Sequence, residues 1–475
     1  MFWRLEELAD HSRGLFDSGD RHFVTYGEIL RRVISFQRLL GSGRKKLVAL
    51  FCDNSVASIV AYLAAIREGH ATMLLNASSD PKLKLRLCEL YSPEMIVSVG
   101  GSLCPADGYD TTIEDRVAVS RAKNPHGGHI SPETALLLST SGTTGSPKLI
   151  RLSHQNLQSN ASSIAQYLGI THSETAITSL PLSYSYGLSV LNSHLLAGSN
   201  VVCTNASLMA KEFWSDFREQ KCTSFAGVPF SYSMLERLRF ERMDLPSLRT
   251  MTQAGGRLDA DNVRYFAQIA KRKGIRFFVM YGQTEATARI SYVPWERLEE
   301  KTSSIGIPIP GGNLRLVKDG VEVTAPGQTG ELVFTGPNVM LGYAESRACL
   351  SKGDELGGTL STGDLGSQDE DGYFYISGRL KRFIKIHGLR LSLDEVEKML
   401  ESALGCTTAC AGNDDHLLVV VESDIQADAT EALNQIVSLY KLHHSSVRVR
   451  LVTELPVTAS GKKDYQRISI ESDQP

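Results

Sequence analysis

The sequence has no apolar run that approaches the roughly 18 residues needed to cross a membrane as a helix. Its opening residues, MFWRLEELAD, include acidic side chains and no apolar core, so we expect no secretory signal. The formal net charge of −3 gives no reason to expect binding to nucleic acid or to an anionic membrane. Among the eight cysteines only Cys406 and Cys410 lie close together, and no second ligand pair for a metal is nearby. These absences predict a cytoplasmic protein with reduced thiols, no membrane span and no nucleic-acid partner.

The chain is long enough for more than one hydrophobic core. It has 475 residues, of which 42% are hydrophobic and 22% are charged, and these are values typical of globular proteins. We find no internal repeat and no low-complexity segment. The length therefore predicts more than one domain.

The most informative segment is a run of hydroxyl and glycine residues that ends in a lysine, TSGTTGSPK. It follows the apolar run 135–138, which we expect to be a buried strand. Glycines let a loop expose consecutive backbone N–H groups to an anion, and the hydroxyls and the lysine add further donors. A polyphosphate is the expected ligand. The candidate residues are Thr140, Ser141, Gly142, Thr143, Thr144, Gly145 and Lys148.

This loop is not a Walker phosphate loop. A Walker loop needs four residues between its glycines and a lysine directly after the second one. Here Gly142 and Gly145 are closer together, and Pro147 stands before Lys148. Pro147 also disfavours helical backbone at the preceding residue, so no helix begins there. A flexible linker is the alternative interpretation of the composition.

Strand and helix patterns alternate along the first part of the chain. We expect strands at 46–52, 71–76 and 95–100, and helices at 55–68 and from Pro81. This order is typical of a mainly parallel sheet with helices on both faces.

The pattern changes after about residue 305. We expect a hairpin over 313–323 that turns at Asp319-Gly320, and further strands at 330–335 and 372–377. From residue 381 the expected order is strand, helix 393–404, strand 416–422, helix 427–442 and strand 446–454. The sequence thus predicts an α/β protein with a large N-terminal domain, residues 1–380, that includes a β unit. A small α+β C-terminal domain, residues 381–475, completes it.

Five later motifs accompany the phosphate loop. They are Tyr281-Gly-Gln-Thr-Glu285, Ser361-Thr-Gly-Asp364, Gly378-Arg379-Leu-Lys381, Lys385-Ile-His-Gly388 and Pro456-Val-Thr-Ala-Ser-Gly-Lys462. In this order they resemble the signatures of adenylate-forming enzymes, which include acyl- and aryl-CoA synthetases, peptide-synthetase adenylation domains and luciferases. The resemblance covers nearly the whole chain and is greatest to the members similar to acyl-CoA synthetases.

The resemblance implies a site for ATP and Mg²⁺. Glu285 resembles the magnesium carboxylate of the family, and Thr284 resembles the residue whose hydroxyl binds the α-phosphate. Asp364 would hold the ribose hydroxyls, which a carboxylate accepts well. Beyond the phosphate loop, the implied ATP- or AMP-binding residues are Gly255, Gly256, Tyr281, Gly282, Gln283, Thr284, Asp364 and Arg379.

The C-terminal motifs imply catalysis and movement. Lys462 resembles the catalytic lysine, which bridges the substrate carboxylate and the α-phosphate and offsets their charge. Lys381 resembles the hinge about which the small domain rotates after adenylation. Lys385 and Gly388 would then face the acceptor thiol.

The acyl pocket is the least clearly defined part of the site. The segment 180–187, LPLSYSYG, matches the substrate-side motif of the family and contains no acidic residue, which disfavours an α-amino acid. From it and from the later segment 225–230 we expect Tyr184, Gly187, Phe225 and Val228 to line the pocket. Core packing explains the same apolar residues equally well.

The sequence thus predicts a ligase that activates a carboxylic acid as its acyl-AMP, releases pyrophosphate and passes the acyl group to a thiol. We expect CoA as the acceptor, and the phosphopantetheine of an acyl carrier protein is the alternative. A non-catalytic nucleotide-binding scaffold is disfavoured, because Lys148, Glu285, Asp364, Arg379 and Lys462 are all present. A luciferase-like oxidase shares these residues and stays open.

Overall fold

The computed structural model describes residues 1–8, 13–100, 108–114, 117–125, 128–139, 148–379, 383–387, 389–413, 415–456, 465 and 468. The described chain divides into two compact units, the first ending at Gly378 and the second beginning at Arg379. No helix among these residues is long and apolar enough to span a membrane.

A nine-stranded sheet forms one half of the first unit. In spatial order its strands are β16 (Ile307–Pro308), β15 (Ser291–Val293), β14 (Arg276–Tyr281), β13 (Thr250–Gln253), β12 (Ser224–Gly227), β10 (Thr175–Ile177), β11 (Asn200–Cys203), β1 (Gly14–Asp17) and β2 (His22–Thr25). The strands from β14 to β1 run parallel, and β15, β16 and β2 are antiparallel to their neighbours. The carboxyl ends of the parallel strands therefore share one edge, where α/β folds place their ligands.

Helices cover both faces of this sheet. They are α4 (His154–Leu168), α5 (Ser185–Leu196), α6 (Lys211–Glu219), α7 (Pro229–Arg237) and α8 (Ala260–Lys273). Aromatic side chains of α6, α7 and α8, such as Phe213, Tyr232 and Phe266, form a core with one face. Ile164 of α4 and Tyr186 of α5 pack on the other face.

An eight-stranded sheet forms the other half of the first unit. Its order is β20 (Gly342–Ala344), β9 (Leu149–Ser153), β8 (Thr134–Ser139), β4 (Ala71–Asn76), β3 (Leu47–Cys52), β5 (Met95–Val99), β7 (Val117–Ala122) and β6 (Tyr109–Glu114). The predicted strands β3, β4, β5 and β8 are its parallel centre. The sequence did not predict the antiparallel hairpin of β6 and β7 that borders it.

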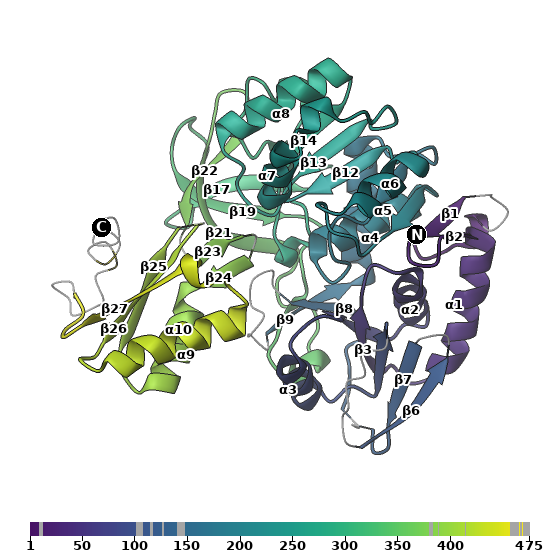
Figure 1. Ribbon diagram of the computed structural model, residues 1–475, viewed down its shortest axis with the longest axis horizontal. Helices are drawn as coiled ribbons and strands as arrows, with labels where there is room; N and C mark the ends of the chain where they lie inside the picture. Colours follow the sequence, from purple (N-terminus) through teal and green to yellow (C-terminus); the bar gives the residue numbers. More distant parts are fainter. Residues whose placement is uncertain are drawn as a thin grey trace. The chain divides into compact units, whose positions relative to one another are not determined.

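The helices of this half lie on either side of the sheet. They are α1 (Tyr26–Leu40), α2 (Val56–Arg67) and α3 (Pro81–Tyr91). α2 is buried on nearly every side, because it packs between the two large sheets with α1, α4 and α5 (Figure 1). α3 covers the opposite face of the eight-stranded sheet.

A five-stranded antiparallel sheet completes the first unit, as expected after residue 305. Its order is β18 (Val321–Val323), β17 (Asn313–Lys318), β19 (Gly330–Thr335), β21 (Thr359–Gln368) and β22 (Phe374–Arg379). The hairpin turns at Asp319 and Gly320, with φ of 53° and 80°, so its predicted position is confirmed. Short 3-10 helices lie at Glu6–Leu8, Phe240–Arg242, Thr284–Ala286, Trp295–Arg297 and Arg347–Ser351.

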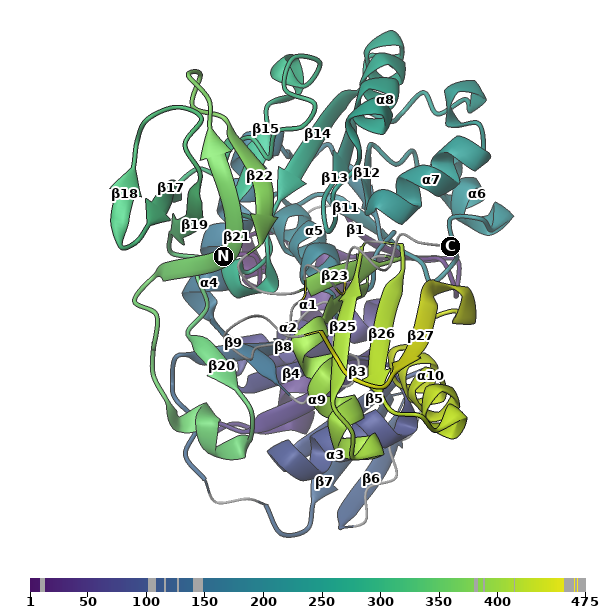
Figure 2. The same cartoon turned by 90° about the vertical axis from the view of Figure 1, so that its left-hand side faces the viewer.

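The second unit has an α+β architecture. Its elements are β23 (Phe383–Ile386), β24 (Leu389–Ser392), α9 (Leu393–Leu404), β25 (Thr408–Gly412), β26 (Leu417–Glu422), α10 (Gln426–Tyr440), the 3-10 helix His444–Ser446 and β27 (Val447–Val452). α9 and α10 pack on one face of the sheet β25-β26-β27 (Figure 2).

Buried histidine makes the stability of the first unit depend on pH. His194 of α5 has an exposed fraction of 4%, with Nδ1 2.8 Å from the carbonyl oxygen of Val190 and Nε2 3.4 Å from Oγ of Ser224. Burial lowers the pKa of His194 below its ordinary value of 6.5, against the opposite influence of Val190 and Glu174. The folded state keeps the imidazole neutral, whereas the unfolded chain binds a proton below that value.

We therefore expect the contribution of His194 to the free energy of unfolding to be complete above pH 6.5 and to be lost as the pH falls below that value. The loss is at most about 1.4 kcal/mol per pH unit. Urea unfolding at about pH 7.5 and about pH 5.5 measures it, and His194→Gln should reduce the difference between the two conditions. If the difference in unfolding free energy between the two pH values were as large in the variant as in the wild type, groups other than His194 would cause the pH dependence.

Candidate active site

Three side chains form a hydrogen-bonded group at the carboxyl end of β14. The hydroxyl of Tyr281 donates to Oδ2 of Asp364 on β21. Nε2 of Gln283 donates to the same carboxylate oxygen at 3.0 Å, to the carbonyl of Thr362 at 3.0 Å, and to Oη of Tyr281 at 3.1 Å. Asp364 and Gln283 are buried. The predicted residues Tyr281, Gln283 and Asp364 are thus in direct contact, and two donors fix the orientation of the carboxylate.

A buried carboxylate lies next to this group. Glu285 belongs to the 3-10 helix that follows β14, and its Oε1 accepts a hydrogen bond of 3.0 Å from the hydroxyl of Tyr343. Its Oε2 is buried and has no hydrogen-bond partner among the described residues. A buried carboxylate oxygen without a donor is costly unless a cation binds it. The donor chemistry at Glu285 therefore fits Mg²⁺, a hard cation that proteins bind through oxygen.

Tyr343 also connects Glu285 to the lysine of the phosphate loop. Nζ of Lys148 lies 3.7 Å from the centre of the Tyr343 ring and 3.8 Å from Oε1 of Glu345. β20 brings Tyr343 there because Tyr343 pairs with Ile150 of β9, shortly after Lys148 in sequence. The structure thus brings Lys148 to the ring face and Glu285 to the hydroxyl of the same tyrosine.

Thr284 contacts the substrate-side motif. Its Oγ1 lies 3.0 Å from Oγ of Ser185, the first residue of α5, and both side chains are buried. Either hydroxyl can donate to the other, which leaves the second proton for a ligand.

The predicted acyl-pocket residues lie between α5, β12 and the end of β13. Gly255 has a φ of 82°, and a Cβ there would lie 2.5 Å from Oη of Tyr184 and 3.0 Å from Cγ1 of Val228. A side chain at Gly255 would therefore fill this space. Phe225 is buried on β12, but its ring packs against Trp214 and Tyr232 in the core with α6, α7 and α8, whereas Tyr184 and Val228 pack against the core on the other face of the sheet. A Cβ at Gly187 would lie 2.3 Å from the carbonyl oxygen of Pro181, so close backbone packing explains this glycine.

Glycines shape the neighbouring loops in the same way. A Cβ at Gly282 would lie 1.8 Å from the carbonyl oxygen of Ala288. Nε2 of Gln253 donates a hydrogen bond of 2.8 Å to the carbonyl oxygen of Gly256, the residue that follows Gly255.

The other predicted residues belong to the second unit or are not described. Lys385 lies on β23 and pairs with Arg390 of β24. The backbone of Arg379 ends β22. The predictions outside the described residues are Thr140, Ser141, Gly142, Thr143, Thr144, Gly145, Lys381, Gly388 and Lys462.

A sequence profile described as AMP-binding enzyme matches residues 7–344. The chain belongs to the AMP-binding enzyme family. Two relatives extend the similarity beyond the profile. Oxalate–CoA ligase of Arabidopsis thaliana is 28% identical over 88% of this chain and 86% of its own length. Indoleacetate–CoA ligase of Aromatoleum aromaticum is 27% identical over 96% of each protein.

A solved structure of the family agrees with this assignment. The o-succinylbenzoate CoA synthetase of Bacillus subtilis, in complex with ATP and a magnesium ion, has a TM-score of 0.64 and 25% identity. The similarity covers 98% of both chains. The predicted α/β fold and the predicted family are therefore confirmed.

Sequence reasoning missed several residues that contact the predicted ones. Tyr343 lies far along the chain from Glu285, and no spacing pattern connects them. The prediction for the segment 180–187 did not include Ser185, which begins α5 and contacts Thr284. Gln283 was predicted to bind the nucleotide, and the structure adds that its side chain donates a hydrogen bond to Asp364.

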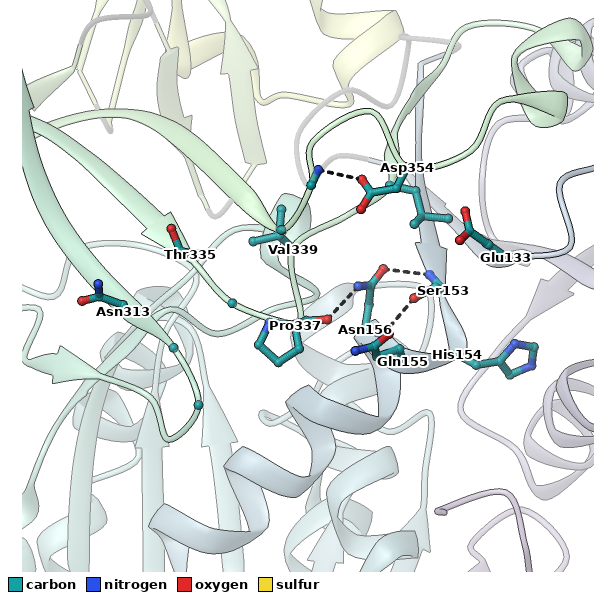
Figure 3. Close-up of a pocket in the computed structure, with 16 residues that line it drawn as sticks. Glu133, Ser153, His154, Gln155, Asn156, Asn313, Thr335, Pro337, Val339 and Asp354 are labelled. Atoms are coloured by element: carbon teal, nitrogen blue, oxygen red, sulfur yellow. Dashed lines mark hydrogen bonds between the residues drawn. The ribbon is translucent and has the colours of Figure 1, made fainter. Parts of the chain in front are cut away.

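A large groove in the same unit lies outside the predicted site. It has a volume of about 730 Å³, and none of the described candidate residues lines it. The side chain of Asn156 accepts a hydrogen bond from the backbone N–H of Ser153 and donates one to the carbonyl of Pro337 (Figure 3). The carboxylate of Asp354 accepts a hydrogen bond from a backbone N–H of its own loop (Figure 3). The side chains of Asn156 and Asp354 thus already have protein partners.

The second unit anchors the end of the chain to α9. The hydroxyl of Tyr465 donates to Oε2 of the buried Glu397 at 3.0 Å, and the backbone N–H of Cys410 donates to Oε1 at 2.6 Å. The contact fixes a residue three positions after Lys462.

Replacing Gln283 by leucine should weaken nucleotide binding more than turnover. The change removes a hydrogen bond to a buried carboxylate, which contributes about 1.5–3 kcal/mol. We expect KM for ATP to rise about tenfold, with a smaller change in kcat. Steady-state kinetics measure both, with the exposed Gln328→Leu as control. An unchanged KM for ATP in Gln283→Leu would show that the orientation of Asp364 is not needed for binding.

Proposed function

We propose that this member of the AMP-binding enzyme family is an ATP- and Mg²⁺-dependent ligase that joins a carboxylic acid to CoA. The observation that carries the proposal is the meeting of Tyr281, Gln283 and Asp364 beside Glu285 and Lys148 at one end of β14. The names of the relatives, oxalate–CoA ligase and indoleacetate–CoA ligase, support an acid as substrate and CoA as acceptor.

In the first half-reaction, a carboxylate oxygen of the acid attacks the α-phosphorus of ATP. The bond from that phosphorus to the β-phosphate oxygen breaks, and pyrophosphate leaves. Two anions approach each other in this step, so positive charge and hydrogen-bond donors must surround the transferring group. We assign the hydroxyl of Thr284 to the α-phosphate and the ammonium of Lys148 to the leaving phosphates.

The nucleoside would lie against the residues at the end of β14. The fixed carboxylate of Asp364 accepts hydrogen bonds from the ribose hydroxyls, and the ring of Tyr281 offers a flat face to the adenine. Glu285 would hold Mg²⁺, which neutralises phosphate charge when bound. Because Gly255 carries no side chain beside Tyr184 and Val228, the ligand can approach its backbone closely.

In the second half-reaction, the thiolate of CoA attacks the acyl carbon of the adenylate. The mixed anhydride bond breaks and AMP leaves. We propose that Lys462 serves the first half-reaction, and that rotation about Lys381 brings Lys385 and Gly388 to the thiol for the second. In this motion the small second unit would present a different segment to the substrate in each half-reaction, while the nucleotide-binding residues of the first unit stay in place.

Carboxylate-dependent exchange of labelled pyrophosphate into ATP tests the proposal. A panel of aliphatic, aryl, hydroxy and amino acids should give a signal with one class, and amino acids should be silent. Adding CoA should then yield a thioester of the same acid. Exchange without thioester would favour a carrier protein as acceptor. No exchange with any acid, while ATP binds, would contradict the proposed function.

A further inference from the structure

A buried arginine near the proposed acyl site has no counter-charge among the described residues. Arg289 has an exposed fraction of 2%, and its guanidinium lies 4.0 Å from the centre of the Tyr186 ring. None of the described carboxylates forms an ion pair with it, and its Nε has no hydrogen-bond partner. A cation–π contact contributes about 0.5–2 kcal/mol, less than the several kcal/mol that burying an unpaired charge costs.

The backbone before Arg289 is held in an unfavourable conformation. Thr287 and Ala288 have φ of 59° and 136°, values that residues with a Cβ rarely adopt. Asn338 fixes this loop, because its amide nitrogen donates to the carbonyls of Ala286 and Arg289 at 2.8 and 2.9 Å. The hydroxyl of Thr287 donates to the carbonyl of Asn338 at 2.6 Å. Strain that is over-determined in this way is typical of functional sites.

Arg289 lines a largely enclosed cavity between the nine-stranded sheet and the helices α4 and α5. The cavity has a volume of about 30 Å³, which is enough for one or two water-sized groups. Phe225 and Thr252 line it from the sheet, and Ser193 and His194 line it from α5. Its walls therefore include a residue that the sequence assigns to the acyl pocket.

The other ionisable groups of the cavity are already partnered or neutral. Glu174 accepts a hydrogen bond from Thr223 and lies 3.9 Å from Arg249. Arg276 donates to Oγ1 of Thr250 at 2.8 Å. Burial favours the neutral form of His194. Neither arginine of the cavity forms an ion pair with a described carboxylate, but Arg276 donates to Thr250, whereas the buried Nε of Arg289 has no hydrogen-bond partner among the described residues.

The position of Arg289 relates it to the reacting centre. Tyr186, on whose ring the guanidinium stacks, follows Ser185, and Ser185 contacts Thr284. Tyr186 also donates to the carbonyl of Thr252 at 3.0 Å, which fixes its ring. An acid that reacts at Thr284 would therefore extend along Tyr186 toward the guanidinium.

We propose that Arg289 binds a second anionic group of the acid substrate, so that the enzyme prefers short acids with an acidic group at each end. This inference rests on the proposed function and names its substrate class. A planar guanidinium binds a carboxylate through two parallel hydrogen bonds, and the low local dielectric of a buried site strengthens them. The small volume favours short acids over long-chain acids, because a long chain needs the helices to move apart.

Matched acids of equal length test the inference. We expect wild-type kcat/KM for succinate to exceed that for butyrate by about 10- to 100-fold. Arg289→Met should lower kcat/KM for succinate by a similar factor and leave that for butyrate within about threefold. Arg289→Lys should restore part of the preference. Arg297→Met is the matched control, since Arg297 also faces an aromatic ring but is exposed and paired with Glu300.

Calorimetric binding of succinate and butyrate supplies a readout that needs no turnover. Succinate should bind at least about tenfold more weakly to Arg289→Met than to the wild type. The assignment of Arg289 would be overturned if succinate bound equally well to Arg289→Met and to the wild type. It would also be overturned if the variant kept the wild-type preference for succinate, or if it lost kcat/KM equally with both acids. Absence of pyrophosphate exchange with every acid would instead contradict the proposed function, and the binding comparison would still decide the role of Arg289.

Discussion

The Lys462→Ala variant should form acyl-adenylate at least about 1000-fold more slowly than the wild type while it still binds ATP. In the proposed mechanism Lys462 contacts the carboxylate and the α-phosphate as their bond forms, so its charge matters most in the transition state. The neighbouring Lys463→Ala is the matched control and should be close to wild type. ATP binding by calorimetry and pyrophosphate exchange separate the two effects.

A second measurement assigns the loss to one half-reaction. Acyl-adenylate supplied ready-made should still be converted to the thioester by Lys462→Ala at nearly the wild-type rate. Near-normal pyrophosphate exchange in this variant would contradict the assignment of Lys462. An equal loss in both half-reactions would show that the lysine acts through the structure of the second unit.

Replacing Glu285 by glutamine should lower the rate of adenylation by about 100- to 1000-fold. The new side chain keeps an oxygen for the hydroxyl of Tyr343, but it lacks the charge that binds Mg²⁺. We expect a higher Mg²⁺ concentration to restore part of the rate. Titration of pyrophosphate exchange with Mg²⁺ measures both the affinity and the rate.

Two variants serve as comparisons for Glu285→Gln. Glu345→Gln changes a carboxylate on the other side of Lys148 that is 71% exposed, and it should change the rate less than about twofold. Tyr343→Phe removes one hydrogen bond to Glu285 and should cost about tenfold at most. An unchanged Mg²⁺ dependence in Glu285→Gln would exclude this carboxylate as the metal ligand.

Local signals predicted the regular elements well. The helix expected over 393–404 is α9, because Ser392 caps its start and Gly405 ends it with a φ of 73°. The strand expected at 330–335 is β19, and the hairpin turn falls at Asp319 and Gly320. In each case the determining residues lie within a few positions of the element.

The missed elements depend on distant partners. β1 pairs with β11, almost two hundred positions further along the chain, and its short sequence GLFD has no distinctive period. β6 is a largely exposed edge strand, YDTTIE, whose composition resembles a loop. Such strands form because a neighbouring strand offers free backbone groups, and this information is not local.

The residues of the candidate site show the same contrast between local and distant information. Motif order identified Tyr281, Glu285 and Asp364, but the hydrogen bond from Tyr281 to Asp364 follows from the packing of two different sheets. Arg289 looks in sequence like one of many solvated charges, and its burial becomes visible only when β14 and β15 pair around it.

The most direct test of the central claim is product analysis with the purified protein, ATP, Mg²⁺, CoA and the acid that gives pyrophosphate exchange. We expect one AMP and one pyrophosphate to appear for each acyl-CoA thioester, and none of the three to form without the acid. Formation of ADP and inorganic phosphate, or of AMP without any consumption of the acid, would contradict it.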